Sequence, residues 1–275
     1  GRTVNVPFQL AICRDDEASF LIRITKILRV LPGRRIVAKA EDGDRHYLVK
    51  IFIGRGARRY ANREIRGVLA IEDAGVRTPF FEWQGRLQAG GGEILAFEYI
   101  EDATSLFEDW RVSDGELRQR LMQGVIPELA RLHESGVIQR DIHPENFLIQ
   151  QDRVYTIDGG HVVRSLHLGQ ARSLDNLSLF LAQFQSDIDE SIPALLALYE
   201  SARGWPRHPE RLGNLLARVG KHRMDRKQDY IAKAFRDCTR FACQKEFGRF
   251  VVCERHCDTP GLRRSEEHTS ELQSP

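Results

Sequence analysis

The sequence lacks long apolar runs, an excess of charge of either sign, and regularly paired cysteines. No apolar segment approaches the length of a membrane span, and no signal peptide precedes the first expected strands, which favours a cytoplasmic protein. Lysine and arginine (41) nearly balance aspartate and glutamate (39), and the formal net charge of +2 gives no reason to expect nucleic acid as a partner. What is present is a hydrophobic content of 41%, enough to bury the core of one large domain or two small lobes.

The five cysteines, an odd number, argue against the disulfide framework of a secreted protein. Four of them crowd the C-terminal end together with one histidine: Cys238, Cys243, Cys253, His256 and Cys257. Zinc binding by this group is conceivable, but the spacings match no paired C-x-x-C pattern.

Both ends of the chain are expected to differ from the native ones. The chain starts at Gly1 rather than Met, and RSEEHTSELQS, from Arg264 to Ser274, resembles the translation of a common DNA-sequencing adapter. We therefore treat 264–275 as an artefact fused to a truncated gene and exclude it from the fold. A natural polar tail is the alternative interpretation.

The first hundred residues are rich in strand patterns. SFLIRITKILRV, IVAKA and HYLVKIF, between residues 19 and 52, are separated by the turns LPGRR and EDGD, in which glycine permits the positive φ of a tight reversal. These segments predict an antiparallel meander. Two more strands are expected in FFEWQGR (80–86) and EILAFEYI (93–100).

One helix is expected between these two groups of strands, over residues 57–73. Its apolar stripe recurs at helical spacing and consists of Tyr60, Glu64, Val68 and Ile71. A carboxylate on an apolar stripe is costly unless it has a partner, so Glu64 is expected to pair with a cation. Gly75 is expected to end the helix.

Beyond residue 100 the patterns become helical. Ser113 and Glu116 have the spacing of a capping box, and they precede a helix in which Pro127 is expected to cause a kink or a break. A short hairpin is expected in FLIQQDRVYTIDGG (147–160), and helices follow from Ser173 onward. The outline is an α+β fold, with a strand-rich first part and a mainly helical second part.

Two polar residues occupy positions that suit chemistry. Lys50 ends the strand LVKIF with apolar neighbours on both sides. It either snorkels from the strand edge or forms a buried ion pair with Glu64, and such a pair could hold nucleotide phosphates. Asp141 lies in QRDIHPENFLI, after a helix and before a strand, where a carboxylate can accept the proton of a hydroxyl group.

Two further residues suit metal binding. Asn146 follows Asp141 by five residues, and Asp158 precedes Gly159-Gly160 after the expected hairpin. An amide oxygen and a carboxylate at such positions can bind Mg²⁺, although Asp and Asn are also common in turns. In this order, the lysine, the glutamate, D-x-x-x-x-N and Asp-Gly match the protein-kinase-like constellation.

On these motifs the sequence resembles the bacterial lipopolysaccharide kinase family, the cytoplasmic kinases that phosphorylate Kdo or heptose in the inner core. The resemblance extends from about Phe20 to Asp189 and includes LRVLPGRRIVAKA, LVKIF, ANRE, AGVRTP, and QRDIHPEN through YTIDGG. It implies a two-lobed protein-kinase-like fold. An antiparallel-sheet N-terminal lobe with one helix (1–100) would bind the nucleotide, and a mainly helical C-terminal lobe (101–263) would bind the acceptor and carry out catalysis.

The resemblance also implies a site for ATP and Mg²⁺. Asp141 would be the catalytic carboxylate, while Asn146 and Asp158 would hold Mg²⁺. The residues implied around the nucleotide are Lys50 at the α- and β-phosphates with its partner Glu64, Gly33 in the turn over the phosphates, and Glu98 and Ile100 at the adenine pocket.

The chain departs from protein kinases at several points. No G-x-G-x-x-G loop is present, and LPGRR offers only Gly33, while Arg34 and Arg35 either supply charge in its place or are surface residues. Gln139 stands where protein kinases usually have His. His143 follows the catalytic-loop aspartate as in aminoglycoside phosphotransferases, and no A-P-E motif follows, so a long peptide-docking activation segment does not fit.

Three functions agree with these motifs. The leading one is ATP-dependent phosphorylation of a sugar hydroxyl (heptose or Kdo) of the lipopolysaccharide inner core. Its acceptor would be an anionic glycolipid, and peripheral contact with the inner face of the inner membrane would follow. Arg164, Arg172 and the basic segment 221–227 are candidates for acceptor or membrane contact, with a solvated surface as the equal alternative. The other two functions are a reduced protein serine/threonine kinase and a pseudokinase scaffold in lipopolysaccharide assembly.

Overall fold

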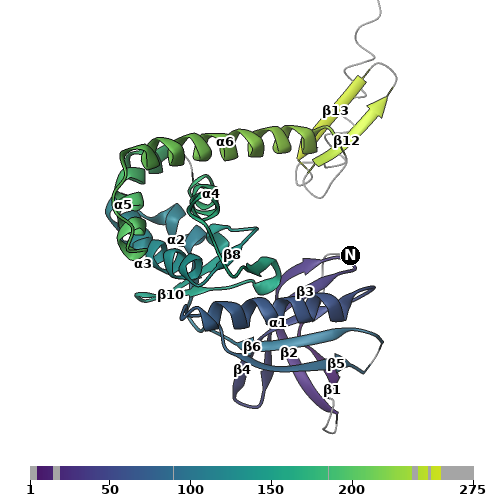
Figure 1. The fold of residues 1–275 in the computed structure, drawn as a ribbon. Coiled ribbons are helices and arrows are strands. Elements are labelled where there is room, and N and C mark those ends of the chain that lie inside the picture. The colour runs from purple at the N-terminus through teal and green to yellow at the C-terminus, as the bar shows by residue number, and fades with distance from the viewer. Residues whose placement is uncertain are drawn as a thin grey trace, which may run out of the picture. The chain divides into compact units, whose positions relative to one another are not determined.

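The computed structural model describes residues 5–14, 19–88, 90–184, 186–236, 241–246 and 249–254. The chain divides into two compact units, Gly1–Leu216 and Ala217–Pro275. The first unit has an α+β architecture, in which strands predominate early in the chain and helices predominate later (Figure 1). The predicted boundary at residue 100 would subdivide this first unit and stays a prediction.

Six antiparallel strands form a closed barrel in the order β1-β2-β3-β4-β6-β5. Their bounds are Phe8–Cys13 (β1), Phe20–Leu31 (β2), Arg35–Asp42 (β3), Arg45–Phe52 (β4), Phe81–Leu87 (β5) and Glu93–Glu98 (β6). The meander β2-β3-β4 and strands β5 and β6 agree with the predicted segments. Strand β1 was not predicted, and it closes the barrel through the pairs Ile12↔Leu87 and Cys13↔Arg86.

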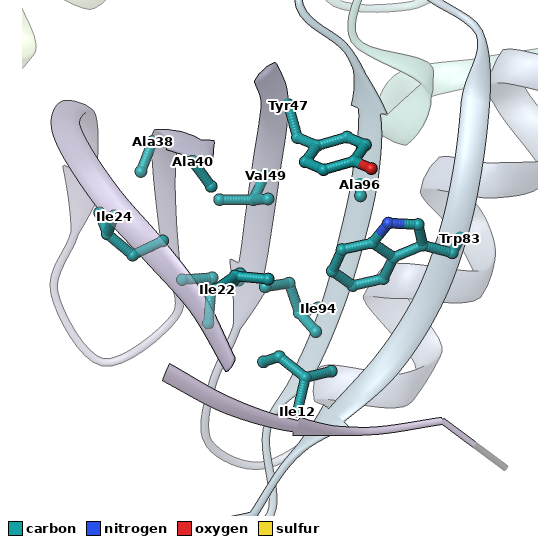
Figure 2. Close-up of a cluster of buried hydrophobic side chains, with 11 residues drawn as sticks. Ile12, Ile22, Ile24, Ala38, Ala40, Tyr47, Val49, Trp83, Ile94 and Ala96 are labelled. Atoms are coloured by element: carbon teal, nitrogen blue, oxygen red, sulfur yellow. The ribbon is translucent and has the colours of Figure 1, made fainter. Parts of the chain in front are cut away.

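The barrel encloses an apolar core that follows from the two-residue period of its strands. On β2, Ile22 and Ile24 are fully buried, whereas the neighbouring Leu21 points to the opposite face of the strand and is 56% exposed. Figure 2 shows the isoleucines and alanines of the core facing Trp83 and Tyr47, whose rings meet edge to face at a centroid distance of 5.8 Å. Tyr47, Val49 and Ile51 of β4 belong to this core, so Lys50 lies on the other face of the strand.

Helix α1, Ala57–Asp73, has the predicted bounds and packs its buried face on the barrel. Glu64 is fully buried on this face, as expected. Tyr60 is 40% exposed, so its predicted place in the apolar stripe is wrong: at this end of the helix Ala57 and Ala61 face the core instead. Gly75 follows the helix with a φ of 71°, and its N–H donates to the carbonyl oxygen of Glu72.

The start of the next helices corrects the sequence interpretation. Helix α2, Leu106–Val112, begins with a capping box formed by Ser105 and Glu108. Helix α3, Gly115–Glu134, is capped by Asp114, whose carboxylate accepts from the N–H of Leu117 at 2.9 Å. The predicted capping box at Ser113 and Glu116 is therefore wrong: the Ser113 hydroxyl donates to the carbonyl oxygen of Asp109 at 2.6 Å and so closes α2.

Pro127 lies inside α3 without breaking it. The proline removes one backbone donor from the helix, but the residues around it keep the helix packed. Ile126 and Leu129 are both fully buried. The expected break at this position is therefore wrong, while the alternative, a kink, stays a prediction.

The remaining elements of the first unit surround the predicted catalytic loop. Two small antiparallel sheets have the strand orders β10-β9-β7 and β11-β8. Strands β9 and β10 form the predicted hairpin. The bounds are Thr104–Ser105 (β7), Val137–Gln139 (β8), Phe147–Gln150 (β9), Arg153–Thr156 (β10), Val162–Arg164 (β11), Gln170–Leu181 (α4) and Ile192–Ala202 (α5). Helix α6, Pro209–Ala234, begins in the first unit and continues into the second.

In the second unit, strands β12 (Phe241–Glu246) and β13 (Arg249–Glu254) form a hairpin that was not predicted. Cys243 pairs with Val252, one residue before Cys253, so the two cysteines point to opposite faces and cannot ligate one ion together. The other members of the conceivable zinc group and the tail 264–275 lie outside the described residues. Within the described part of the chain, His, Cys, Asp and Glu form no group of three or more suited to a metal ion.

Among the helices of the described ranges, none is both long and apolar enough to cross a membrane.

Candidate active site

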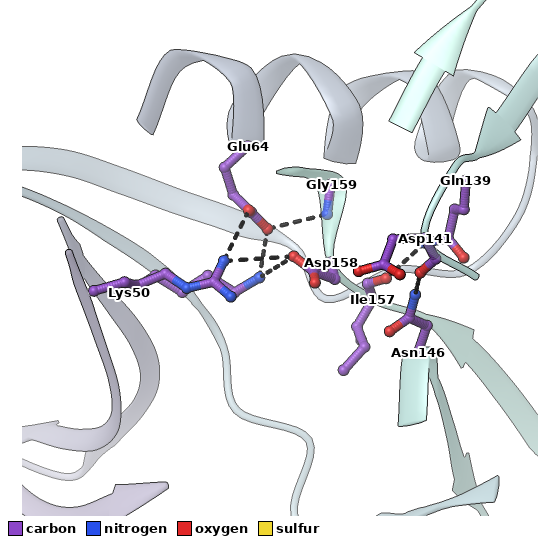
Figure 3. A network of polar contacts seen from close by, with 9 residues as sticks. Lys50, Glu64, Gln139, Asp141, Asn146, Ile157, Asp158 and Gly159 are labelled. Carbon is purple, nitrogen blue, oxygen red and sulfur yellow. Dashed lines mark hydrogen bonds and ion pairs between the residues drawn. The ribbon is translucent and has the colours of Figure 1, made fainter. Parts of the chain in front are cut away.

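Lys50 and Glu64 form an ion pair in the interior of the first unit (Figure 3). Lys50 is 7% exposed on β4 and Glu64 is 0% exposed on α1, so Lys50 does not snorkel to the surface. Lys50 Nζ donates to Glu64 Oε1. Two buried charges of opposite sign compensate each other's loss of hydration, which neither could bear alone.

Glycines bring the loop after β10 against the backbone of α1. A Cβ atom on Gly67 would lie 1.9 Å from the carbonyl oxygen of Gly159, and one on Gly159 would lie 2.3 Å from the carbonyl oxygen of Glu64. The N–H of Gly159 donates to Glu64 Oε1 at 3.0 Å. This contact places the neighbouring Asp158 beside the ion pair, with Oδ1 3.6 Å from Lys50 Nζ. The role of Gly67 was not predicted, because a glycine inside a helix carries no sign of its partner.

Asp158 is held in an unusual backbone conformation. Its φ of 70° and ψ of 73° lie in the left-handed region, which costs a residue with a Cβ about 1–2 kcal/mol. Burial alone would raise the pKa of its carboxyl group. Nearby groups that can carry positive charge outweigh burial and hold this pKa below its usual value, namely Lys50, Arg35 and His161. Asp158 therefore remains an anion, and its strained backbone conformation places this anion beside Lys50.

The predicted catalytic loop lies between β8 and β9. The Asp141 side chain is 61% exposed, and its Oδ1 lies 3.1 Å from Nε2 of His143. Asn146 ends a short 3₁₀ turn, Pro144–Asn146, and its Nδ2 donates to the carbonyl oxygen of Asp141 at 2.9 Å. The N–H of Ile157 in turn donates to the carbonyl oxygen of Asn146 at 2.8 Å, which joins this loop to the segment that carries Asp158.

Gln139 makes a second link between these two segments. Its buried Nε2 donates to the carbonyl oxygen of Ile157 at 2.7 Å (Figure 3). The backbone carbonyl of Gln139 accepts from Asn176 Nδ2 at 2.8 Å. The replacement of the usual histidine by glutamine thus leaves the turn well anchored.

A buried polar network lies behind Gln139. His133 on α3 lies 2.9 Å from Asn176 Oδ1 through Nε2 and 2.7 Å from the Tyr199 hydroxyl through Nδ1. Because Asn176 Oδ1 only accepts, Nε2 of His133 carries the proton, and Nδ1 accepts from Tyr199. The Tyr199 hydroxyl accepts from Arg203 Nη1 at 3.0 Å. This network was not predicted, although polar residues on the apolar faces of α3 and α4 were a usable signal.

Burial lowers the pKa of His133 to about 4. The hydrogen bond to Asn176 acts in the opposite direction, and the Arg203 guanidinium assists burial. His133 is therefore neutral at physiological pH, in agreement with the single tautomer that its partners select.

A cavity of about 420 Å³ opens beside the ion pair, within the size range of small-molecule sites. Five of the predicted site residues line it: Lys50, Glu98, Ile100, Asn146 and Asp158. Glu64 lies behind Lys50, and Asp141 is not part of the lining. Gly33 is in the turn between β2 and β3 with a φ of 70° and does not line the cavity either, whereas Arg35 does.

The donor groups at the cavity suit a hard divalent cation. Asp158 Oδ1 is buried and has no hydrogen bond in the described part of the chain. Asn146 uses its Nδ2 for the Asp141 carbonyl, which leaves its amide oxygen as an acceptor. One carboxylate and one amide oxygen are typical protein ligands of Mg²⁺, which completes its coordination with water and phosphate oxygens.

Comparison with known protein families and with curated proteins finds no match. Two solved structures of WbdD, described as a bifunctional kinase-methyltransferase, match the fold with TM-scores of 0.51 and 0.52 at 16% identity. The matches cover 77% of this chain and 53% and 54% of WbdD, so the chain spans about half the length of that protein. This likeness supports a kinase-like fold, while membership of the lipopolysaccharide kinase family stays a prediction.

Proposed function

We propose that the chain is an ATP-dependent kinase that phosphorylates a sugar hydroxyl, of heptose or Kdo, in the lipopolysaccharide inner core. One observation carries the proposal: the ion pair of Lys50 and Glu64 lies 3.6 Å from Asp158, at a 420 Å³ cavity that Asn146 also lines. The kinase-like fold supports the same conclusion. The proposed lobes, 1–100 and 101–263, would hold ATP between them.

The proposed reaction needs little covalent help from the protein. Lys50 binds the α- and β-phosphates, and the exposed Asp141 accepts the proton of the attacking hydroxyl. Asn146 and Asp158 would hold Mg²⁺, which supplies charge neutralisation of the phosphates when bound. The hydrogen bond from Asn146 to the backbone carbonyl of Asp141 fixes the position of the proposed metal ligand relative to the proposed catalytic residue.

The segment after Asp158 favours a sugar over a peptide as acceptor. Val162–Arg164 pairs with β8, and α4 already begins at Gln170, so little chain remains to form a peptide-docking loop. The choice of an inner-core sugar rests on the family resemblance. Cytoplasmic location with peripheral contact at the inner membrane belongs to the same proposal. Of the arginines considered for acceptor contact, Arg164 has Nη1 2.8 Å from Asp73 Oδ2 at the surface.

The test is phosphate transfer from γ-labelled ATP with Mg²⁺, offering lipopolysaccharide core and casein in parallel. We expect label on the core with the wild type and a loss of at least about 1000-fold in Asp141→Ala, because the hydroxyl loses its base and its orientation. Nucleotide affinity should be unchanged, since Asp141 does not line the cavity. Asp152→Ala, an exposed aspartate in the turn of the β9–β10 hairpin, is the matched control and should keep full activity.

The outcomes separate the candidate functions. Label on casein alone would replace the sugar kinase by a reduced protein kinase. Nucleotide binding without any transfer would favour the pseudokinase scaffold. Full activity of Asp141→Ala would show that another group is the catalytic carboxylate.

A further inference from the structure

Arg35 occupies the place where a glycine-rich loop would cover the phosphates in a protein kinase. It is the first residue of β3, directly after the turn that contains Gly33. Its side chain is 17% exposed and lines both the 420 Å³ cavity and a smaller one of about 140 Å³ beside α1. Arg35 is therefore an inward-facing cation of the site and not a surface residue.

The guanidinium of Arg35 forms long ion pairs with two carboxylates but donates a hydrogen bond to neither. Nη1 lies 3.6 Å from Asp158 Oδ1 and 3.8 Å from Glu64 Oε2. Both oxygens are buried and accept no hydrogen bond in the described part of the chain. An arginine whose role is to bridge carboxylates makes contacts of about 2.7–2.9 Å, usually two in parallel. The distances at Arg35 are too long for that role.

Charge balance gives Arg35 a different role. Lys50 and Arg35 balance Glu64 and Asp158, and both cations lie 3.6 Å from the same oxygen of Asp158. A divalent cation on Asp158 would take over that carboxylate, and Arg35 would then face only Glu64, which is already paired with Lys50. The phosphates of a nucleotide bring several negative charges to the same place, where the chain offers no run of glycine N–H groups.

We propose that Arg35 binds the terminal phosphates of the nucleotide and thereby replaces the backbone donors of a glycine-rich loop. This inference rests on the proposed function, because it concerns the same nucleotide site. The planar guanidinium supplies several N–H donors in a fixed arrangement that matches phosphate oxygens, which a single backbone glycine cannot do. Arg35 on β3 and Lys50 on β4 then bind the phosphates from neighbouring strands.

The experiment compares the affinities for ATP and for adenosine, measured by titration calorimetry at constant Mg²⁺ without acceptor. In Arg35→Gln we expect the ATP affinity to fall by about 10- to 100-fold, the range for losing hydrogen bonds to a charged group, and the adenosine affinity to stay unchanged. Arg35→Lys keeps the charge but not the planar fork, so it should lose less. The matched control is Arg34→Gln, which removes the same charge one residue earlier from an exposed side chain that does not line the larger cavity.

The ratio of the two affinities distinguishes phosphate binding from a structural role. An equal loss for ATP and adenosine, an unchanged ratio in Arg35→Gln, or an equal loss in Arg34→Gln would each overturn the inference. If Arg35→Gln does not fold, the inference fails unless Arg35→Lys, compared with the wild type, lowers the ratio by at least about threefold. A wild type that binds ATP but transfers no phosphate would refute the proposed kinase activity. The ratio of the two affinities would then still decide whether Arg35 binds the phosphates. A wild type that binds neither ligand would refute both.

Discussion

At the scale of single residues, the site depends on two charges that lie almost completely out of contact with water. Lys50 and Glu64 are 7% and 0% exposed. Removing one partner of such a pair leaves an uncompensated buried charge, whereas replacing both with apolar residues of similar size is often nearly neutral. Stability and function therefore respond differently to the same substitutions.

We expect Lys50→Met and Glu64→Leu each to lower the free energy of unfolding by about 3 kcal/mol. The double variant should recover most of this loss, because Arg35 and Asp158 still balance each other at 3.6 Å. Nucleotide binding should remain impaired in the double variant, since Lys50 is absent. Urea unfolding of the four proteins measures the coupling. Losses that simply add in the double variant would show that the two charges act independently.

The pairing of Glu64 could be foreseen from sequence because a carboxylate on an apolar helical stripe needs a cation. Lys50 could be identified as this cation, because it also has apolar neighbours on both sides in the sequence. The position of Arg35 could not be decided in this way. The side chain of a residue beside a turn can point to either face of a strand. In β3, Ala38 and Ala40 face the barrel core, and Arg35 lies with Val37 on the other face, toward the cavity.

At the scale of elements, α1 and the loop that carries Asp158 meet through backbone atoms. Gly67 and Gly159 have no side chains, so the backbone of α1 lies closer to the backbone of the loop than it could if either residue had a Cβ atom. The distance between Glu64 and Asp158 is therefore set by the contact of two main chains.

Gly67→Ala should lower the free energy of unfolding by about 2 kcal/mol or more, because its Cβ would lie 1.9 Å from a backbone oxygen and the helix must shift. The affinity for ATP should fall with it. Gly213→Ala is the matched control. This glycine lies in α6, and an added Cβ there meets nothing within 4 Å, so alanine should stabilise by about 0.5–1 kcal/mol. Thermal unfolding of both variants would show the difference, and a stabilised Gly67→Ala would contradict the close contact.

Prediction of elements succeeded where periodicity was long and failed where neighbouring signals competed. The pattern over 57–73 gave the bounds of α1 correctly. Ser113 was misassigned because two residues that can cap a helix, Ser113 and Asp114, stand side by side, and the hydroxyl of the first is used by the preceding helix. Strand β1 is short and mostly half-buried, and one of its partners is β5, far along the chain, so local sequence gave little sign of it.

At the scale of the whole first unit, the network around His133 connects the helices to the catalytic loop. Residues from α3, α4 and α5 contribute to it, and it ends at the backbone of Gln139 in β8. Each member has its hydrogen-bonding role fixed by the next, so the network requires His133 to be neutral.

The stability of the first unit should therefore depend on pH through His133. Its pKa is lowered from 6.5 to about 4, so the unfolded chain binds the proton more readily. The contribution is fully present above pH 6.5 and is lost as the pH falls toward 4, by about 3 kcal/mol in total. Urea unfolding between pH 4 and 7 measures this slope. His133→Gln should flatten the dependence of the unfolding free energy on pH in this window, whereas His208→Gln, at an exposed position, should leave it as in the wild type. If His133→Gln showed the same slope as the wild type, His133 would not be the cause.

The closed barrel has a consequence for the order in which the chain can be assembled during synthesis. Strands β1 to β4 pair with their neighbours in sequence, but β1 also needs β5, and Ile12 and Leu87 are 75 residues apart (87 − 12). Until β5 and β6 have left the ribosome, β1 and β4 each present an unpaired edge to any extended chain nearby. The hydrogen bonds between β1 and β5 therefore form late, and they carry the largest entropy cost of loop closure among the strand pairs of the barrel. The interval before residue 98 emerges is when a growing chain of this protein is most exposed to pairing with the wrong partner.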